Sequence, residues 1–424
     1  MSFQQGLSGL NSSAKALDVV SNNIANANTI GFKTAEVHFS DVFAASLSGG
    51  GAAQGGIGAA VSGIVQQFSQ GNLTTTSNPM DVSINGGGFY QMESPAKVET
   101  VSRNGQFHID KEGYMINDQG LKLMGINADS KGQIPPGASQ AVPIVLSADT
   151  LAPRATSDPV IASPQMGMTV NLNAASIVPA TAFDPTKPDT YNYSTGMQVF
   201  DISGVAHQLN AYFVRSATTG TWDVYTGLAD DLVASVPQTA LAGSLTFDAS
   251  GNGQLDPLVQ TLVAPVANIL LNQAATTWSP GDISFAGSTQ YGSNSGVSSL
   301  VQNGYATGEL TGFSISSKGV VQGSYSNGQV QDKAQIQLVN FRNPNALQSV
   351  GNNQWTYNAD SGTPLPGFPG QGLYGALQSA AVEESNVDMT AELVKMITQQ
   401  RNYQSNAQSI KTQDQIMQTL VNLR

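Results

Sequence analysis

The residues whose chemistry could support catalysis are few and lie far apart in the chain. His38, His108 and His207 are the only histidines, and they occur in neither H-x-x-x-H nor H-E-x-x-H spacing, the patterns that hold zinc on one helix. The chain has no cysteine, which excludes disulfides and thiolate metal ligands. Serine is abundant, yet no G-x-S-x-G segment is present. These observations predict a protein that is not an enzyme.

Acidic residues cluster at three places, none of which fits a catalytic or metal site. The adjacent pairs Asp230-Asp231 and Glu383-Glu384 are more typical of a solvated turn and of a helix start than of an acid/base pair. Asp248 begins a segment that resembles a calcium loop, with Gly253 at the sixth position. The twelfth position is Val259, where such a loop needs a bidentate Glu, so we expect a β-turn. We predict no catalytic residue, no metal and no cofactor.

The composition excludes several classes of partner. A chain of 424 residues is expected to form two or three domains. Its net charge is −12 with 17 basic residues, which argues against nucleic acid and anionic membranes as partners. No stretch approaches the roughly 18 apolar residues of a membrane-spanning helix. The N-terminus also lacks the apolar core of a secretory signal. We therefore predict neither membrane insertion nor a cleaved signal peptide.

The longest regular pattern lies at the C-terminus, in residues 385–424. This segment contains neither Gly nor Pro. Steps of four and three residues from Met389 to Val421 reach ten positions, of which eight are apolar or aromatic. Such a heptad pattern predicts one long helix that packs against another helix. Ser385 and Asp388 fit a capping box at its start.

A matching apolar stripe begins at Phe3 and continues to Ile24 without a proline. A stripe this narrow suits a helix–helix seam better than the face of a globular domain. Two interpretations are open: a terminal helix pair that caps an ordinary domain, or a pair of assembly elements that pack against other copies of the chain. The second interpretation assigns the assembly contacts to Phe3, Leu7, Leu10, Leu17, Ile24, Met389, Leu393, Met396, Tyr403, Ile410, Met417 and Leu420.

Between the two helices the sequence predicts β structure. Residues 81–90 alternate polar and apolar side chains and run into a glycine cluster, which is typical of a strand that enters a tight turn. Residues 103–114 predict a turn, a strand and a second turn, and residues 313–321 repeat part of that pattern. Asn327-Gly328 then supplies a hairpin turn. We expect residues 71–147 and 284–364 to form one discontinuous β-domain.

The remaining segments complete the domain organisation. Residues 148–283 are predicted to be an inserted outer β-domain, with a hairpin at 211–225. We expect residues 28–70 to form a flexible or extended linker, because residues 48–63 are rich in Gly and Ala and no Lys follows the glycines as in a phosphate-binding loop. Within this linker, residues 36–42 fit a short strand. Residues 1–27 and 385–424 are the terminal helices, and 365–384 form a connector. The predicted fold class is mixed and mainly β: long terminal α-helices pair as a coiled coil, with two nested β-rich domains.

Motifs at both ends resemble one protein family. The run from Ser21 to Lys33, SNNIANANTIGFK, is similar to the N-terminal signature of the bacterial flagellar rod and hook family. The ESNVD segment at 384–388 and the QRNY segment at 400–403 resemble the other end of that family, and the segments at 84–89 and 104–113 resemble its internal motifs. The signature residues are Asn22, Asn23, Asn26, Asn28, Thr29, Gly31, Phe32, Lys33, Ser385, Asn386, Val387 and Asp388.

The resemblance implies a structural subunit that polymerises with itself. In such a family the subunit is exported unfolded by the flagellar type III apparatus and builds a flexible hollow tube, the universal joint between rod and filament. Implied partners are rod, hook-cap and hook–filament junction proteins, and the implied location is the extracellular flagellum. The long insertion favours a hook-type subunit, with a distal rod protein or another axial flagellar subunit as the alternative. A secreted β-rich enzyme or adhesin is a remote alternative, because it leaves both heptad stripes unexplained.

Overall fold

The chain is mainly β with two α-helices. The computed structural model describes residues 2–43, 56–129, 132–135, 140–147, 150–156, 166–229, 232–233, 236–237, 239–248, 253–255, 261–263, 270–271, 274–275 and 281–422. Two compact units are present. Unit 1 consists of residues 1–148, 311–324 and 330–424, and unit 2 of residues 149–310 and 325–329.

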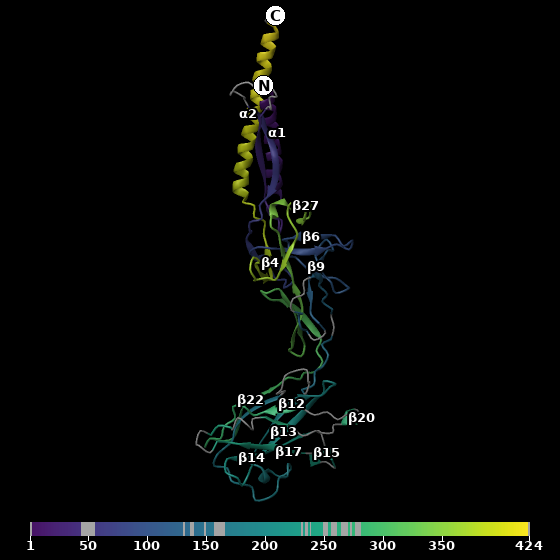
Figure 1. Cartoon of the computed structure of the whole chain (residues 1–424), viewed down its shortest axis with the longest axis vertical. Helices are drawn as coiled ribbons and strands as arrows, with labels where there is room; N and C mark the ends of the chain where they lie inside the picture. Colours follow the sequence, from purple (N-terminus) through teal and green to yellow (C-terminus); the bar gives the residue numbers. More distant parts are fainter. Residues whose placement is uncertain are drawn as a thin grey trace. The chain divides into compact units, whose positions relative to one another are not determined.

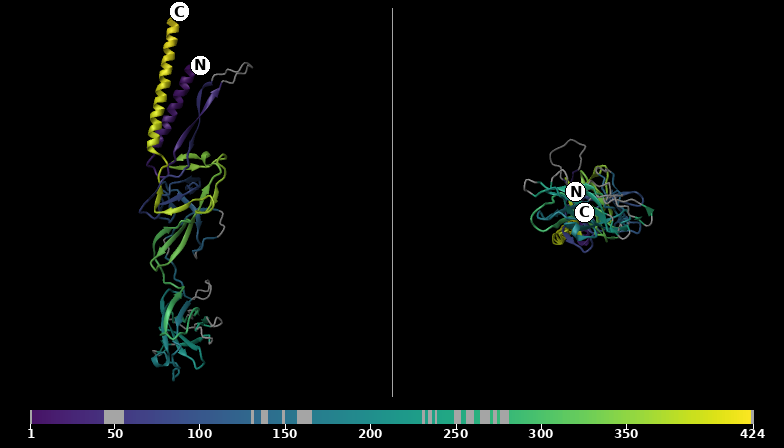
Figure 2. Two further views of the ribbon diagram at one scale, coloured as in Figure 1. Left: turned by 90° about the vertical axis from the view of Figure 1, so that its left-hand side faces the viewer. Right: turned by 90° about the horizontal axis from the view of Figure 1, so that it is seen from below.

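Unit 1 contains both helices, α1 (Ser2–Ala25) and α2 (Met389–Asn422). They lie side by side and antiparallel, and the C-terminal part of α2 extends past the first turn of α1 (Figures 1 and 2). The end of α1 follows from its asparagines. The side-chain amide of Asn26 donates to the carbonyl oxygen of Asn22 at 3.0 Å, and this local bond competes with further helix.

A two-stranded antiparallel hairpin lies beside α1, formed by β1 (Ala35–Phe43) and β2 (Gly56–Gln66). Strand β1 agrees with the short strand expected at 36–42. Strand β2 lies where we expected a flexible or extended linker, so that expectation was wrong for β2. The glycines of β2 lower its strand propensity, which concealed it in the sequence. Contacts with α1 compensate: the hydroxyl of Ser8 accepts a hydrogen bond from the backbone N–H of Ala59 at 3.3 Å.

The rest of unit 1 is a β-domain whose main sheet follows the order β23-β24-β25-β9-β5-β6-β28-β27. Strands β9, β5 and β6, from before unit 2, lie between β25 and β28, which follow it. Two further pairs, β3–β31 and β4–β30, also join strands from before unit 2 with strands from after it. The strands are β3 (Leu73–Thr75), β4 (Val82–Asn85), β5 (Phe89–Glu93), β6 (Glu99–Ser102), β7 (His108–Ile109), β8 (Met115–Ile116), β9 (Lys122–Asn127), β10 (Val142–Pro143), β23 (Leu310–Ile315), β24 (Val320–Tyr325), β25 (Val330–Ile336), β26 (Leu338–Asn340), β27 (Gln348–Gly351), β28 (Gln354–Thr356), β29 (Leu365–Gly367), β30 (Ala376–Ser379) and β31 (Ala381–Glu383).

Two apolar clusters stabilise this β-domain. The larger one includes Tyr90, Met92 and Ile336, and the smaller one surrounds the buried ring of Trp355. The rings of Phe68 and Trp355 pack edge to face, with 5.3 Å between their centroids. Phe68 lies just after β2, so this contact attaches the base of the β1–β2 hairpin to the β-domain.

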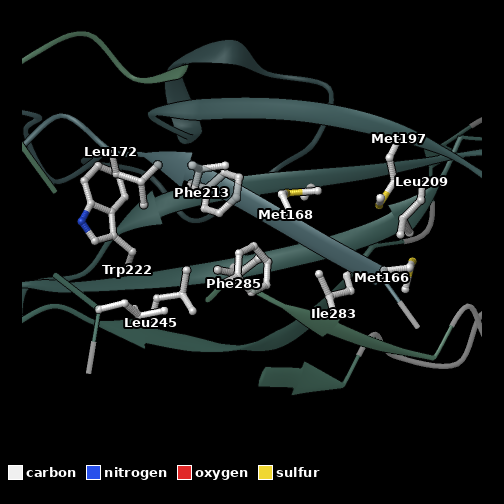
Figure 3. Packing of buried hydrophobic residues seen from close by; sticks show 14 of the residues in the cluster. Met166, Met168, Leu172, Met197, Leu209, Phe213, Trp222, Leu245, Ile283 and Phe285 are labelled. Atoms are coloured by element: carbon white, nitrogen blue, oxygen red, sulfur yellow. The ribbon is translucent and has the colours of Figure 1, made fainter. Parts of the chain in front are cut away.

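Unit 2 is built from two four-stranded sheets, β18-β21-β11-β22 and β12-β13-β14-β17. Figure 3 shows side chains of both sheets meeting in one core, with Met168 and Ile283 from one sheet and Phe213 and Trp222 from the other. The strands are β11 (Met166–Asn171), β12 (Tyr193–Phe200), β13 (Ala206–Arg215), β14 (Thr221–Leu228), β15 (Leu232–Val233), β16 (Val236–Pro237), β17 (Ala240–Thr246), β18 (Thr261–Val263), β19 (Leu270–Leu271), β20 (Ala274–Ala275), β21 (Asp282–Ser284) and β22 (Gly296–Gln302).

The predicted elements hold better than the predicted boundaries. The hairpins β13–β14 and β24–β25 confirm the strand and turn patterns of the sequence. The chain re-enters unit 1 at residue 311 rather than 284, because β22 pairs with β11 inside unit 2. The expected connector at 365–384 instead supplies β29, β30 and β31, which pair with β26, β4 and β3.

Candidate assembly site

Small residues make the contact between the two helices. A Cβ added at Gly9 would lie 2.8 Å from the side-chain nitrogen of Asn406, and one added at Gly6 would lie 3.0 Å from Ile410. Further along α1, Ala16 and Val20 are buried. Because these side chains are small, α2 approaches α1 closely, and several larger apolar side chains of both helices, such as Leu7 and Leu393, are left exposed on other faces.

The predicted assembly residues divide between the helix contact and the surface. Ile410 contacts α1 at Gly6, and Met396 is half-buried, as are Leu10, Leu17 and Ile24. The others are exposed: Phe3 at 51%, Leu7 at 44%, Leu393 at 45% and Met417 at 60%, together with Met389 and Tyr403. The structure places Leu420 on α2 and describes nothing of its side chain. Their role in assembly stays a prediction.

The position of Met417 follows from the register of the helices. Gly9 lies opposite Asn406, and Gly6 lies opposite Ile410. Moving toward the N-terminus of α1 by one turn therefore corresponds to moving toward the C-terminus of α2 by one turn. Met417 lies two heptad-type steps, three and four residues, beyond Ile410 on the same line of α2. The start of α1 at Ser2 therefore falls short of it, and its side chain is uncovered.

The β1–β2 hairpin adds an apolar surface that the sequence did not reveal. Phe39 pairs with Val61, and Val37 pairs with Ile64, so these four side chains share one face of the hairpin. Phe39 is 46% exposed and Ile64 is 47% exposed. The only sequence signal was the alternation of Val37 and Phe39, which is too short to separate a strand from an extended linker.

A buried group of charges joins the two ends of the chain to the β-domain, and we call it the polar cluster: Lys33, Arg103 and Glu383. The Nζ of Lys33 lies 2.6 Å from Oε1 of Glu383, and Nη1 of Arg103 lies 3.3 Å from Oε2. The side chains of Lys33 and Glu383 are 0% exposed and that of Arg103 is 4% exposed. Lys33 also donates to the carbonyl oxygen of Ser69 at 2.7 Å.

The polar cluster holds two cations against one carboxylate. Burial lowers the pKa of Lys33 below its usual value, and the charge of Glu383 opposes that shift. Burial likewise lowers the pKa of Arg103, with Glu383 again opposing. Glu383 is therefore the group on which both buried cations depend. Its Oε1 also accepts the backbone N–H of Gly71 at 3.0 Å.

Two asparagines of the signature segments hold the chain on either side of the polar cluster. Asn23 exchanges two hydrogen bonds with the backbone of Ala35, at 2.9 and 3.0 Å, and donates to the buried Oε2 of Glu392 on α2 at 3.1 Å. Asn386 accepts the backbone N–H of Thr34 at 2.8 Å and donates to the carbonyl oxygen of Gln67 at 2.8 Å. Each amide thus connects segments that are far apart in the sequence.

Gly31 and Asp388 have clear local roles. Gly31 has φ +71°, and a Cβ there would lie 2.7 Å from the backbone nitrogen of Asn104. Asp388 caps α2: its Oδ1 accepts the backbone N–H groups of Thr390 and Ala391 at 2.9 and 3.1 Å. The capping box at Ser385 was therefore wrong, because Ser385 lies outside the helix and its hydroxyl accepts from Val387 instead.

The other signature residues lie around the end of α1. The hydroxyl of Thr29 donates to Oδ1 of Asn26 at 3.2 Å. Phe32 and Val387 are half-buried, and Asn22 and Asn28 are exposed.

Sequence reasoning missed Arg103, Glu383 and Glu392 as members of this site. Glu383 was interpreted as part of a helix start, yet it ends β31 and is buried, while the adjacent Glu384 is exposed. A charged residue at the end of a strand carries no sequence signal of its burial, because the compensating Lys33 is 350 positions away.

The residues considered for catalysis are not brought together. His38 lies on β1, His108 on β7 and His207 on β13. Among the residues that the structure describes, no three His, Asp or Glu side chains could hold a metal ion. The calcium-like loop at 249–252 and the pair Asp230-Asp231 lie outside the described residues. Within the described residues, neither α1 nor α2 is long and apolar enough to cross a membrane.

Comparisons with known proteins identify relatives over the whole chain. Family models match four segments: the flagella basal body rod protein at 3–33, the flagellar hook protein FlgE/F/G D1 domain at 83–150, the flagellar basal body protein FlaE D2 domain at 171–305, and the flagellar basal body rod FlgEFG protein C-terminal at 378–423. The chain is 41% identical to the flagellar hook protein FlgE of Salmonella typhimurium and 40% identical to that of Escherichia coli, each over 100% of both chains. The crystal structure of Helicobacter pylori flagellar hook protein FlgE2 shares the fold, with a TM-score of 0.50 and 14% identity, covering 72% of this chain and 99% of that one.

Proposed function

The chain belongs to the flagellar hook protein family, and from this membership we propose that its terminal helices and β1–β2 hairpin make the contacts that build the hook. The observation that carries this proposal is the apolar surface of unit 1. Phe3 and Leu7 on α1, Leu393 on α2 and Phe39 on the hairpin are each at least 44% exposed. An apolar surface of this kind on a soluble subunit marks an interaction site.

The partner of this surface is further copies of the same chain. A helix with a sustained heptad pattern packs against other helices, and here α1 covers only one line of α2. Several subunits would pack against the apolar faces of α2 that α1 leaves exposed, forming a coiled-coil inner wall. We propose that the hook polymer is a flexible hollow tube that serves as a universal joint for motility.

The same family membership supports coarser proposals about location and partners. Rod, hook-cap and hook–filament junction proteins would meet the ends of the polymer, and the type III export apparatus would deliver the subunit, without a cleaved signal peptide, to the extracellular flagellum. The role is structural rather than enzymatic. The distal rod alternative is less well supported, because the hook protein of Salmonella typhimurium matches the chain over 100% of both lengths.

Electron microscopy of polymerised subunits tests the proposal. Wild-type chain should form tubes, and Leu393→Asp should not, since each interface would bury an unpaired charge. Asn402→Asp is the matched control: Asn402 is also exposed on α2, and nine residues of α-helix place it on the side opposite Leu393. Circular dichroism should show the β-domains of both variants folded. Normal tubes from Leu393→Asp would contradict the assignment.

A further inference from the structure

A pocket of about 320 Å³ lies in unit 1, beside the polar cluster and between the end of α1, the base of the β1–β2 hairpin and the turn that joins β27 to β28. Its walls come from segments far apart in the sequence. Amide side chains dominate them, and the rings of Phe32 and Trp355 supply the apolar part. Its volume is at the lower end of the range for ligand pockets, about 300–1,000 Å³.

Most polar groups of the pocket are already paired within the chain. The side-chain nitrogen of Asn353 donates to the carbonyl oxygen of Ile30 at 2.8 Å, and the indole N–H of Trp355 donates to Oε1 of Gln66. The Nζ of Lys33 is held by Glu383 and Ser69. No charged group is therefore free to hold an ion in this pocket.

Two amides at the pocket remain available. Asn352 makes no side-chain hydrogen bond with the described residues, and Asn22 uses only its oxygen, which accepts from Asn26 at 3.4 Å. Both side chains are exposed. An amide offers a donor and an acceptor without charge, which is what the N–H and C=O groups of an extended peptide require. The pocket is thus suited to the backbone of an extended segment that also carries an apolar side chain.

The chain itself contains such a segment. Strand β1 pairs with β2 on one side, and its other edge faces no described strand. Phe39 projects from β1 and is 46% exposed. Phe32 is half-buried, and an aromatic ring packed against it would gain both burial and an edge-to-face contact. The free edge of β1 would present backbone groups to Asn22 and Asn352.

We propose that the β1–β2 hairpin of a second copy of this chain docks at this pocket, with its Phe39 against Phe32 and its backbone on the amides of Asn22 and Asn352. This inference rests on the proposed function, since it concerns the contacts between subunits of one polymer. It names a contact between the hairpin of one copy and the β-domain of the next, separate from the packing of terminal helices.

Cross-linking tests the contact directly, because the chain has no cysteine and a single introduced thiol can be labelled alone. Asn352→Cys carrying a maleimide–benzophenone probe should, after illumination of the polymer, link to a peptide within residues 35–66 of another copy. The monomer should give no such dimer. Links from position 352 only to other segments, or only within one copy, would overturn the inference. A wild-type chain that forms no polymer would instead refute the proposed function and with it this contact.

A double-mutant cycle gives the second measurement. Asn352→Gly removes the amide while Gly accepts the φ of +53° at this position, and it should raise the critical concentration of polymerisation about fivefold. Phe39→Ala should raise it about tenfold. The double variant should fall clearly short of the product of the two, since both changes remove one contact. Asn28→Ala, an exposed signature asparagine outside the pocket, should leave the value unchanged. Full additivity, or equal effects of all three changes, would overturn the proposal.

Discussion

Glu383→Gln is the most informative perturbation of the polar cluster, because one carboxylate serves two buried cations. In the folded chain its oxygens lie 2.6 Å from Nζ of Lys33 and 3.3 Å from Nη1 of Arg103. Removing one partner of a buried ion pair costs about 3–5 kcal/mol, since the other charge stays buried and uncompensated. We expect unit 1 to lose stability by at least this amount, because two cations are affected.

Lys33→Met is the matched control from the same cluster. It leaves Glu383 and Arg103 as a pair of opposite charges, and the carbonyl oxygen of Ser69 keeps a donor, the side-chain amide of Asn386 at 3.2 Å. We expect a cost of about 0–2 kcal/mol, because Glu383 keeps Arg103 as its partner and the substitution also removes the desolvation cost of the Lys33 charge. The two substitutions should therefore differ by several kcal/mol although they act on the same ion pair.

The pH dependence supplies an independent check with a defined sign. The folded-state pKa of Lys33 lies below its usual value of 10.5, so between these two values the unfolded chain binds more protons than the folded chain. Stability contributed by this group therefore rises with pH across that window. Without Glu383 the folded-state pKa falls further, so Glu383→Gln should regain part of its lost stability at alkaline pH, and the double variant with Lys33→Met should not.

Amide hydrogen exchange is the suitable assay, because a chain of two units does not unfold in one transition. Peptides that cover residues 28–35, 66–72 and 380–390 should lose protection in Glu383→Gln, while peptides of β13 and β14 in unit 2 serve as the internal reference. Equal stability of Glu383→Gln and wild type, or a larger loss in Lys33→Met than in Glu383→Gln, would refute the view that one carboxylate compensates both cations.

Three further predictions follow from other parts of the chain. The backbone N–H of Leu151 donates to the carbonyl oxygen of Gly308 at 2.8 Å, so a short Gly-Ser linker can replace residues 152–307. This variant should keep unit 1 folded and should still polymerise, and loss of the unit 1 fold in circular dichroism would contradict the prediction. Residues 393–420 should exchange their amides rapidly in the monomer and slowly in the polymer, because most of α2 has no neighbour except α1; strong protection in the monomer would refute it. The carboxyl of Asp184 should titrate with a pKa of about 2, because it accepts hydrogen bonds from the hydroxyl and the backbone N–H of Thr186. The stabilisation from these bonds is therefore present above the usual pKa of 3.8 and is lost as the pH falls toward 2. In an NMR titration Thr186→Ala should raise the pKa of Asp184, and an unchanged pKa would exclude this cause.

The long-range patterns of the sequence predicted the helices and many strands. The heptad spacing of α2 and the stripe of α1 gave both terminal helices to within a few residues, since periodicity depends only on local geometry. Strand β2 was missed because its glycines lower strand propensity and because its stabilising contacts come from β1 and α1. The return to unit 1 was placed too early because the strand β22 can be assigned to a unit only through its partner β11.

The candidate site was predictable only in part. Asn23, Lys33 and Asn386 were identified through the family signature, but their partners were not. Arg103 and Glu383 carry no local pattern, and the cluster exists only because β6 and β31 converge on the segment after α1. A contact between positions 33 and 383 depends on the whole topology of unit 1, which no spacing along the sequence encodes.

The distribution of contacts in unit 1 separates two tasks of the terminal segments. Hydrogen bonds and ion pairs are concentrated at the base of the helices, where Asn23, Lys33 and Asn386 attach both ends of the chain to the β-domain. Such groups need well-defined geometry and are costly to leave unpaired once buried, so they favour one arrangement of the joint. Large apolar side chains lie instead on the exposed faces of the helices and the hairpin, as Leu7, Leu393 and Phe39 do. Apolar burial is non-directional, so these faces can pack against neighbours in more than one register. A subunit with a specified polar base and adaptable apolar faces fits the flexible polymer that we propose for this chain.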